Sequence, residues 1–357
     1  MEGCRLKRVV LLGDVHQLPP IVQSATLAHA CGLDQSLFAR LIRLRVPTVQ
    51  LDAQGRCRPA LARLFAWRYE HLRNLPAALQ ATVTRANACL RYVCQVVDVA
   101  DYANQGEVST ADHSVKNEGE AEYVVAFFEY LRLCGYPAEV ITILSAYKSQ
   151  RECIQAKLKE RCKKNPLFGM PRKVTTIDKY QGQQNEIVLL SLVRTRSVGY
   201  LRDVRRLLVG VSRAKLGLYV FCRASLFREC AELKPIMDVL LEKPVKLALV
   251  ENEYYPCERK EEEEVKSFEV GEEREGEVEG KDVTHMMQIV SQWYEVRRQS
   301  YMEQWKEMDV VEWGVCWNKE GYAKNCITAR DTSMGEDGMK GGCFCVNRSF
   351  FSILLFQ

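Results

Sequence analysis

The chain has 357 residues, of which 47% are hydrophobic and 27% charged, and its formal net charge is +4. These values exclude a chain that is disordered throughout and leave room for two globular domains. The charge is unevenly distributed: residues 1–250 carry 37 Lys and Arg against 23 Asp and Glu, and residues 251–357 carry 13 against 23. A basic globular part suits a polyanion, although a basic solvated surface accounts for the charge equally well.

The fifteen cysteines do not indicate a metal site or a disulfide framework. The sequence has no Cys-x-x-Cys pair, and Cys343-x-Cys345 has no matching pair of cysteines or histidines. We therefore expect reduced cysteines, no metal ligands and an intracellular protein. No signal peptide is visible, and the apolar run 350–356 is too short to cross a bilayer, so no membrane partner is expected.

The first elements in chain order are a strand, a loop and two helices. An apolar run predicts a buried strand at 7–12, followed by the polar loop 13–20. Apolar residues at helical spacing predict amphipathic helices over 33–45 and 58–72.

Strands and helices alternate through the middle of the chain. We predict strands at 90–99, 140–144, 174–177, 187–193 and 216–221, and helices up to 133, at 149–161 and at 203–212. The helix that ends near 133 should begin after Asn117, because Glu120 follows three residues later, as in a capping box. This alternation predicts an α/β fold with a parallel sheet covered by helices on both faces.

The last hundred residues differ in character. A stretch rich in glutamate predicts a disordered acidic extension over 249–281, because it lacks the apolar residues that would offset the entropy of ordering. Residues 282–298 can form a helix, and the remainder of the tail to residue 357 shows no periodic pattern.

Four blocks carry the chemistry: GDVHQLPP at 13–20, LDAQGRCRP at 51–59, TIDKYQGQQNE at 176–186 and RRLLVGVSRAK at 205–215. In this order they resemble motifs III to VI of superfamily 1 helicases, in the branch that includes the nonsense-mediated-decay helicase. Within these motifs the residues QGRCRP and QGQQNE, together with the segment WRYEHLRNLP at 67–76, are similar to the corresponding residues of intron-binding helicases of the spliceosome.

The resemblance implies a fold and a function. Residues 1–48 would be the C-terminal part of a first RecA-like domain, and 49–248 the second RecA-like domain of a P-loop NTPase, followed by a disordered linker (249–281) and an irregular tail (282–357). The implied activity is that of an ATP-dependent RNA helicase of pre-mRNA splicing in the nucleus. Its cofactors would be ATP and Mg²⁺, and its partners single-stranded intron RNA and spliceosomal proteins.

Two motifs of such helicases are missing from the sequence. A phosphate loop of the form Gly-x-x-x-x-Gly-Lys-Ser/Thr and an Asp-Glu pair for magnesium normally precede motif III, and neither string occurs here. We therefore expect the C-terminal portion of a longer protein, and negligible ATP hydrolysis by this chain alone.

The resemblance assigns catalytic roles to three residues. Arg56 and Arg213 match the arginines of the fourth and sixth motifs, which neutralise the phosphates during hydrolysis, and Gln17 is expected near the γ-phosphate. The alternative for Arg213 is an ion pair at the end of its helix. His16, in the same loop as Gln17, is not expected to act as a general base, because hydrolysis in this family uses an acidic residue from the missing half.

The resemblance also suggests residues for the nucleotide and for RNA. Tyr147 would stack on the nucleotide base with Lys148 beside it at a phosphate, and Gly182 and Gln184 would lie near the ribose, where many relatives have Glu in place of Gln184. A core or surface tyrosine is the alternative for Tyr147. The candidates for RNA backbone contacts are Ser145, Thr175 and Thr176.

Two other functions remain open. The chain can be a non-catalytic RNA- or protein-binding fragment, or part of a related helicase of the same branch that works on DNA or RNA–DNA hybrids.

Overall fold

A computed structural model describes residues 9–20, 22, 24–111, 114–261, 277–307, 313–317 and 323–327. The chain falls into two compact units, residues 1–291 and 292–357. Both predicted RecA-like ranges lie in the first unit, so the predicted division at residue 48 stays a prediction. The second unit contains an antiparallel pair formed by β12 (Trp313–Trp317) and β13 (Ala323–Ile327).

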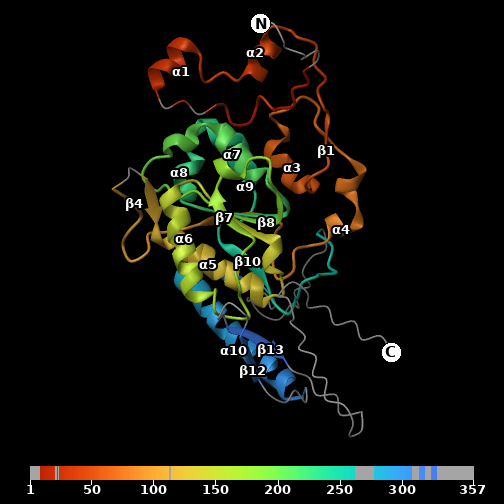
Figure 1. Cartoon of the computed structure of the whole chain (residues 1–357), viewed down its shortest axis with the longest axis vertical. Coiled ribbons are helices and arrows are strands. Elements are labelled where there is room, and N and C mark those ends of the chain that lie inside the picture. Colours follow the sequence, from red (N-terminus) through yellow and green to blue (C-terminus); the bar gives the residue numbers. More distant parts are fainter. Residues whose placement is uncertain are drawn as a thin grey trace. The chain divides into compact units, whose positions relative to one another are not determined.

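Five parallel strands form the central sheet of the first unit, in the order β3-β9-β8-β6-β7. Figure 1 labels β7 and β8 of this sheet. The strands are β3 (Cys94–Asp98), β6 (Ile141–Ser145), β7 (Lys173–Thr176), β8 (Asn185–Ser191) and β9 (Ala214–Cys222). Because every neighbouring pair is parallel, the carboxyl ends of the strands share one edge of the sheet and the amino ends share the other. The predicted parallel α/β fold is confirmed.

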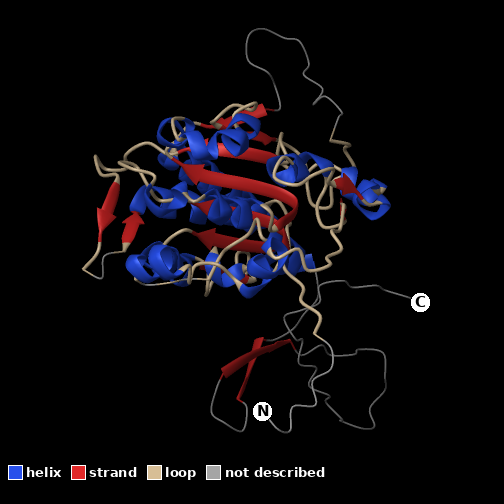
Figure 2. Ribbon diagram, turned by 90° about the horizontal axis from the view of Figure 1, so that it is seen from above, coloured by secondary structure: helices blue, strands red, loops and turns tan. Residues whose placement is uncertain are grey.

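Helices cover both faces of this sheet, and Figure 2 shows the strands between the helical layers. The covering helices are α3 (Pro59–Ala66), α5 (Glu118–Leu133), α6 (Lys148–Arg161), α7 (Val204–Val211), α8 (Ala224–Arg228) and α9 (Lys234–Leu240). In β9, Leu218 and Val220 pack into the core formed with α3, α7, α8 and α9, whereas the rings of Tyr219 and Phe221 contact Phe127 of α5. Burial on both faces explains why this strand is apolar from Leu216 to its end.

Short elements connect these layers. They are the parallel pair β1 (Ala53–Gln54) and β2 (Arg73–Asn74), the antiparallel pair β4 (Glu107–Ser109) and β5 (Val115–Asn117), helix α4 (Ala81–Thr84), and the 3₁₀ helices η1 (Pro76–Leu79), η2 (Ala138–Val140), η3 (Asp178–Tyr180), η4 (Gly199–Arg202) and η5 (Ala231–Leu233).

Capping side chains fix the starts of two helices. The Asn117 side chain accepts a hydrogen bond from the Glu120 backbone nitrogen at 3.1 Å, as the sequence predicted for α5. Asp203 caps α7 by accepting from the Arg205 backbone nitrogen at 3.1 Å. Each cap satisfies a backbone donor that lacks a partner within its helix.

The N-terminal segment differs from its prediction. Residues 9–12 are not a strand, and Val10 and Leu12 are 83% and 94% exposed. The physical reason is that a buried parallel strand needs neighbouring strands, and the described residues supply none at this place. Helix α1 (Ala25–Cys31) precedes α2 (Leu37–Arg43), which is the helix predicted over 33–45, in shortened form.

The helix predicted over 58–72 also ends early, at Ala66 of α3. Leu61, Leu64 and Phe65 are buried, as their helical spacing predicted. Tyr69 lies in the turn that follows, where its hydroxyl contacts the N-terminal loop instead of continuing the helix face.

The acidic extension is ordered at both ends, which the prediction for 249–281 missed. Strand β10 (Leu247–Val250) pairs antiparallel with β11 (Glu277–Gly280), and Glu253 forms an ion pair with Arg259 at 2.5 Å. Glu253 also accepts a hydrogen bond from the Cys89 backbone nitrogen at 2.9 Å, and local composition could not show a partner so far away in the sequence. Residues 262–276, the centre of the acidic run, lie outside the described residues.

Helix α10 (Val283–Glu307) begins as predicted near 282 and extends beyond 298. Val283, Met286, Ile289 and Val290 in its first half are buried. Within the described part of the chain, no helix combines the length and the apolar character that a membrane crossing requires.

Glu120 provides a pH-dependent test of this fold. Its carboxylate is fully buried, accepting hydrogen bonds from the Ser191 hydroxyl at 2.6 Å and the Val193 backbone nitrogen at 2.8 Å. Burial raises the pKa of Glu120 to about 8, and these hydrogen bonds only partly offset the effect.

Between its ordinary pKa of 4.5 and about 8, folded Glu120 retains a proton that the unfolded chain has released. The free energy of unfolding should therefore fall as pH rises through this window. In Glu120→Gln this decrease should be smaller by on the order of a few kcal/mol. Chemical unfolding at both ends of the window measures the effect. Glu152→Gln, an exposed change on α6, is the control. An equal pH slope in wild type and Glu120→Gln would contradict the assignment.

Candidate functional site

Arg213 lies directly before β9 and is 1% exposed. Its Nε donates to the Val209 carbonyl at 2.8 Å, and its Nη2 donates to the Ser212 hydroxyl at 2.7 Å. The same guanidinium contacts the Gln183 carbonyl at 3.4 Å and the Gln17 side-chain oxygen at 3.3 Å. Arg213 therefore joins the end of α7, the turn before β8 and the N-terminal loop.

Arg56 reaches the same corner from the segment before α3. Its Nε donates to the Gln184 side-chain oxygen at 2.8 Å, and its Nη1 donates to the Ser212 carbonyl at 2.9 Å. The side chain of Gln54 shapes this segment, since it accepts from the Arg56 backbone nitrogen at 2.9 Å and donates to Asn74 at 2.6 Å. Arg56 and Arg213 are thus brought together by shared contacts with Ser212.

The charge of Asp14 acts on Arg213 from nearby, but its carboxylate bonds to Gln17 and Tyr69 and not to the arginines of this corner. Among the described residues, neither Arg56 nor Arg213 forms a salt bridge, so the alternative of an ion-paired Arg213 is wrong for this part of the chain. Burial, and then the neighbouring Arg56 charge, lowers the pKa of Arg213 to about 10, which keeps it protonated at neutral pH. Two adjacent guanidinium groups that share no direct salt bridge with a described carboxylate favour an anion between or beside them.

The N-terminal loop is tied to this corner through Asp14 and Tyr69. The Tyr69 hydroxyl donates to Asp14 Oδ2 at 2.6 Å, and the Gln17 side-chain nitrogen donates to the same oxygen at 2.7 Å. The His16 ring packs edge-on against Tyr69, with 5.1 Å between ring centroids. Sequence reasoning placed Tyr69 on an apolar helix face and missed this contact, for which the helical spacing gave no signal.

The turn before β8 carries Gly182 and Gln184. Gly182 has φ +79°, a conformation that favours glycine. The neighbouring Gln183 is anchored by Lys173, whose Nζ donates to its side-chain oxygen at 2.7 Å. This turn presents the exposed Gln184 side chain to Arg56, so both predicted residues of the motif lie at the arginine corner.

Tyr147 and Lys148 do not lie with the arginines, and their predicted grouping around one nucleotide is corrected here. They follow the carboxyl end of β6, whereas Arg213 precedes the amino end of β9. Strand β8 lies between these strands, runs parallel to both, and spans about 20 Å over its seven residues. In a parallel sheet, residues that follow one strand and residues that precede another lie at opposite edges.

Aromatic and basic side chains surround Tyr147 at the carboxyl edge. Its ring packs edge-on against Tyr200 with 4.7 Å between centroids, and the Arg194 guanidinium lies 5.9 Å from its ring centre. Arg206 lies over the Tyr200 ring at 4.5 Å. The sequence analysis did not single out Tyr200, Arg194 or Arg206, which follow β8 or begin α7.

The three predicted RNA-contact residues lie at or near this edge but differ in exposure. The Ser145 hydroxyl is buried and bonds to the backbone of Tyr147, donating to its carbonyl at 3.1 Å and accepting from its nitrogen at 3.2 Å. It therefore shapes the loop instead of facing a ligand. Thr175 is also buried, and Thr176 is half-buried at the end of β7.

Over the described ranges, no group of three or more His, Cys, Asp or Glu side chains is arranged to hold a metal ion. The polar chemistry of the arginine corner comes from guanidinium, amide and hydroxyl groups, which fit phosphate oxygens. These groups provide no set of carboxylates for Mg²⁺.

A family model described as an AAA domain matches residues 33–225, more than half of the chain. The chain therefore belongs to this AAA-domain family, and both the resemblance to superfamily 1 helicases and the expected RecA-like architecture are confirmed.

Among curated proteins, the chain is 50% identical over 257 residues to RNA helicase aquarius of Mus musculus, a match that covers 72% of this chain. It is 34% identical over 217 residues, or 60% of its length, to NFX1-type zinc finger-containing protein 1 of Mus musculus. It is 28% identical over 237 residues, or 66% of its length, to pre-mRNA-splicing factor cwf11 of Schizosaccharomyces pombe. The matches cover 17%, 11% and 18% of these relatives, respectively.

The buried position of Arg213 predicts a structural cost of its removal. Arg213→Ala would leave buried carbonyl groups without a donor, and should lower the free energy of unfolding by about 2–4 kcal/mol. Arg63→Ala is the control, because Arg63 forms an exposed ion pair with Glu242 and should cost less than about 1 kcal/mol. Urea unfolding of the three proteins measures both values. Equal stability of Arg213→Ala and wild type would show that these hydrogen bonds do not form.

Proposed function

We propose that this chain supplies the second RecA-like domain of an Aquarius-like, ATP-dependent RNA helicase that moves on single-stranded intron RNA in the nuclear spliceosome. The observation that carries the proposal is the convergence of Arg56 and Arg213 at Ser212 with no carboxylate partner. The names of two relatives, an RNA helicase and a pre-mRNA-splicing factor, support the RNA substrate and the role in splicing.

At the arginine corner, Arg56 and Arg213 would neutralise the charge that develops on the terminal phosphates of ATP during hydrolysis. ATP supplies the phosphoanhydride bond that is broken. Gln17 would contact the γ-phosphate, since its loop already touches Arg213. The Gln184 amide group would donate to a ribose hydroxyl while its oxygen holds Arg56 in place. The described residues offer no magnesium site, so none is assigned.

At the carboxyl edge, Tyr147, Lys148 and Thr176 would contact RNA. A half-buried tyrosine beside one exposed lysine suits a base that stacks while its phosphate is neutralised. Lys148 is 64% exposed at the start of α6, and Arg194 is held over the Tyr147 ring. We therefore assign Tyr147 and Lys148 to RNA instead of to the nucleotide.

Helix α7 would couple the two edges. Its amino end follows Tyr200, whose hydroxyl donates to the Ala146 carbonyl beside Tyr147, and its carboxyl end leads into Ser212 and Arg213. The eight residues of α7 span about 12 Å. A displacement of the arginines by ATP or its products would thus move residues at the RNA edge.

The arginine assignment predicts a loss of turnover. In a helicase that carries this region together with a phosphate loop, Arg56→Ala should lower kcat for ATP hydrolysis by about 10³-fold. Arg56 is preferred to Arg213 because it is only half-buried, and so folding is less affected. Lys234→Ala, a change of an exposed residue of α9, is the control.

The present chain alone should hydrolyse ATP negligibly. ATPase activity of this chain that is lost in Arg213→Ala would contradict that expectation. In the phosphate-loop-containing helicase, an unchanged kcat in Arg56→Ala would refute the proposal that Arg56 neutralises charge on the phosphates of ATP.

The RNA assignment predicts weak, salt-dependent binding. Affinity for a single-stranded RNA should fall about ten-fold between 50 and 200 mM salt, because two or three phosphates would be neutralised. Lys148→Gln should reduce both the affinity and the salt slope, whereas Lys234→Gln, an equally exposed change on α9, should not. Fluorescence anisotropy with labelled RNA measures these values. Affinity that is independent of salt would count against the proposal.

A non-catalytic RNA-binding module is the second candidate, because the sequence contains no phosphate loop. This second candidate function predicts the same salt-dependent RNA binding, but no effect of ATP on that binding. A shift in RNA affinity on adding ATP to the phosphate-loop-containing protein, abolished by Arg56→Ala, would favour the helicase.

A further inference from the structure

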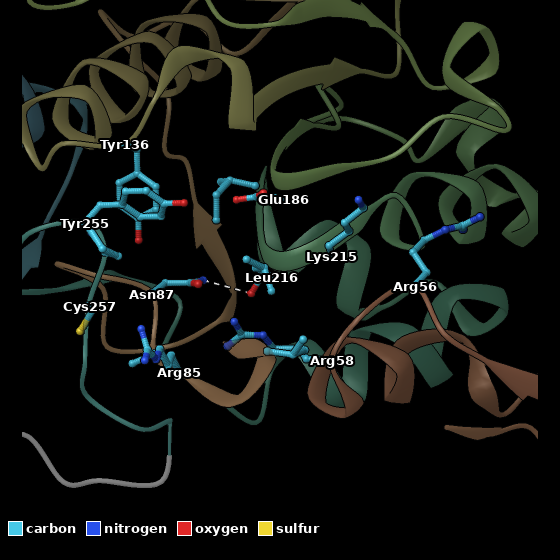
Figure 3. A pocket seen from close by; sticks show the side chains of 14 residues that line it. Arg56, Arg58, Arg85, Asn87, Tyr136, Glu186, Lys215, Leu216, Tyr255 and Cys257 are labelled. Atoms are coloured by element: carbon cyan, nitrogen blue, oxygen red, sulfur yellow. Dashed lines mark hydrogen bonds between the residues drawn. The ribbon is translucent and has the colours of Figure 1, made fainter. Parts of the chain in front are cut away.

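A cavity of about 380 Å³ lies beside the arginine corner. It is enclosed by the amino ends of β8 and β9, the segment 83–87 and the segment 255–257, as Figure 3 shows. Arg56 lines one end of this cavity, but its guanidinium bonds to Gln184 and Ser212 in the corner already described. The volume is typical of small-molecule sites.

The walls of the cavity are strongly basic. Arg58, Arg85 and Lys215 line it together with Arg56, against a single lining carboxylate, Glu186. Among the described residues, the side chains of Arg85 and Lys215 have no ion-pair partner. A cavity with this excess of positive charge attracts an anion.

Arg58 adds a buried and incompletely satisfied cation. It is 1% exposed, and its Nε has no hydrogen-bond acceptor in the described structure. Its Nη1 makes only a long contact of 3.4 Å with Glu261, a residue of the acidic extension. Burial of a guanidinium without full hydrogen bonding is costly, and an oxyanion in the cavity would relieve the cost.

The opposite side of the cavity offers two aromatic rings, tilted by 37° to each other. The rings of Tyr136 and Tyr255 lie 4.6 Å apart between centroids, and Figure 3 shows them across from Arg58 and Arg85. The Asn87 amide nitrogen donates to the Leu216 carbonyl at 3.2 Å and to the Tyr219 hydroxyl at 3.1 Å, which leaves its carbonyl oxygen able to accept from a ligand. An aromatic ring with N–H groups would fit this side.

We propose that this cavity binds a nucleoside monophosphate group, with the phosphate at Arg58, Arg85 and Lys215 and the base against Tyr255. A phosphate monoester fits better than a carboxylate. Glu261 already brings a carboxylate to Arg58, yet Arg85 and Lys215 remain unpaired. A phosphate carries nearly two charges and three acceptor oxygens, and the volume exceeds what inorganic phosphate alone would fill. The site is separate from the helicase function proposed above and does not require ATP hydrolysis.

Calorimetric titration of the full chain with AMP, adenosine and inorganic phosphate tests the site. AMP should bind more tightly than either of its parts. The double variant Arg85→Gln/Lys215→Gln should weaken AMP binding by about ten-fold or more. These residues are exposed and half-buried, so the variant should fold, as a thermal melt would verify. Lys234→Gln, outside the cavity, is the matched control.

Short RNAs with a 5′-phosphate or a 5′-hydroxyl distinguish the two sources of the group. Tighter binding of the phosphorylated RNA that depends on Arg85 and Lys215 would assign the site to an RNA end, whereas binding of AMP alone would assign it to a free nucleotide.

Three results would overturn the proposal: no AMP binding at about 1 mM, AMP binding unchanged in the double variant, or AMP binding lost in Arg56→Ala but kept in the double variant. The last result would place AMP in the arginine corner.

Discussion

Arg213 donates hydrogen bonds to the end of α7, to the turn before β8 and to the loop that carries Gln17. A buried guanidinium is tolerated only where its donors find acceptors, so these three segments are fixed relative to one another by one side chain. With no carboxylate bound to it among the described residues, its charge also repels Arg56. The same interaction therefore builds the corner and leaves it ready for an anion.

The parallel sheet separates this corner from the aromatic and basic edge around Tyr147. Because all five strands point the same way, loops that follow strands gather at one edge and residues that precede strands gather at the other. One domain can thus offer a nucleotide-contacting corner and an RNA-contacting edge without mixing their residues. Helix α7 runs between them, which gives the proposed coupling a rigid physical path.

The acidic extension has a different role from that expected of a solvated linker. Its ordered beginning lies against the domain, where Glu253 accepts from the Cys89 backbone nitrogen at 2.9 Å and Arg259 donates to the Leu90 carbonyl at 2.9 Å. Glu261 reaches the buried Arg58. The segment thereby forms one wall of the basic cavity. Charge runs are usually solvated, but here Glu261 of the run lies 3.4 Å from Arg58, a cation that the domain has buried.

Much of the fold could be predicted because its signals are local. Apolar runs located the five strands, and Asn117 with Glu120 marked the start of α5. Prediction failed for residues 9–12, where strand formation depends on neighbouring strands, and at the end of α3, where Tyr69 bonds to Asp14 instead of extending the helix. Side-chain partners of this kind lie far away in sequence and leave no periodic trace.

The sequence by itself determined the α/β class, the order of the helicase-like blocks and the residue types available for chemistry, since these depend on spacing along the chain. Tertiary structure alone decided which of those residues meet. Arg56 contacts a residue 128 positions away and Arg213 one 196 positions away, whereas Tyr147 lies at the opposite edge from both. The physical reason is that such meetings depend on the direction and register of packed strands, which no single segment encodes.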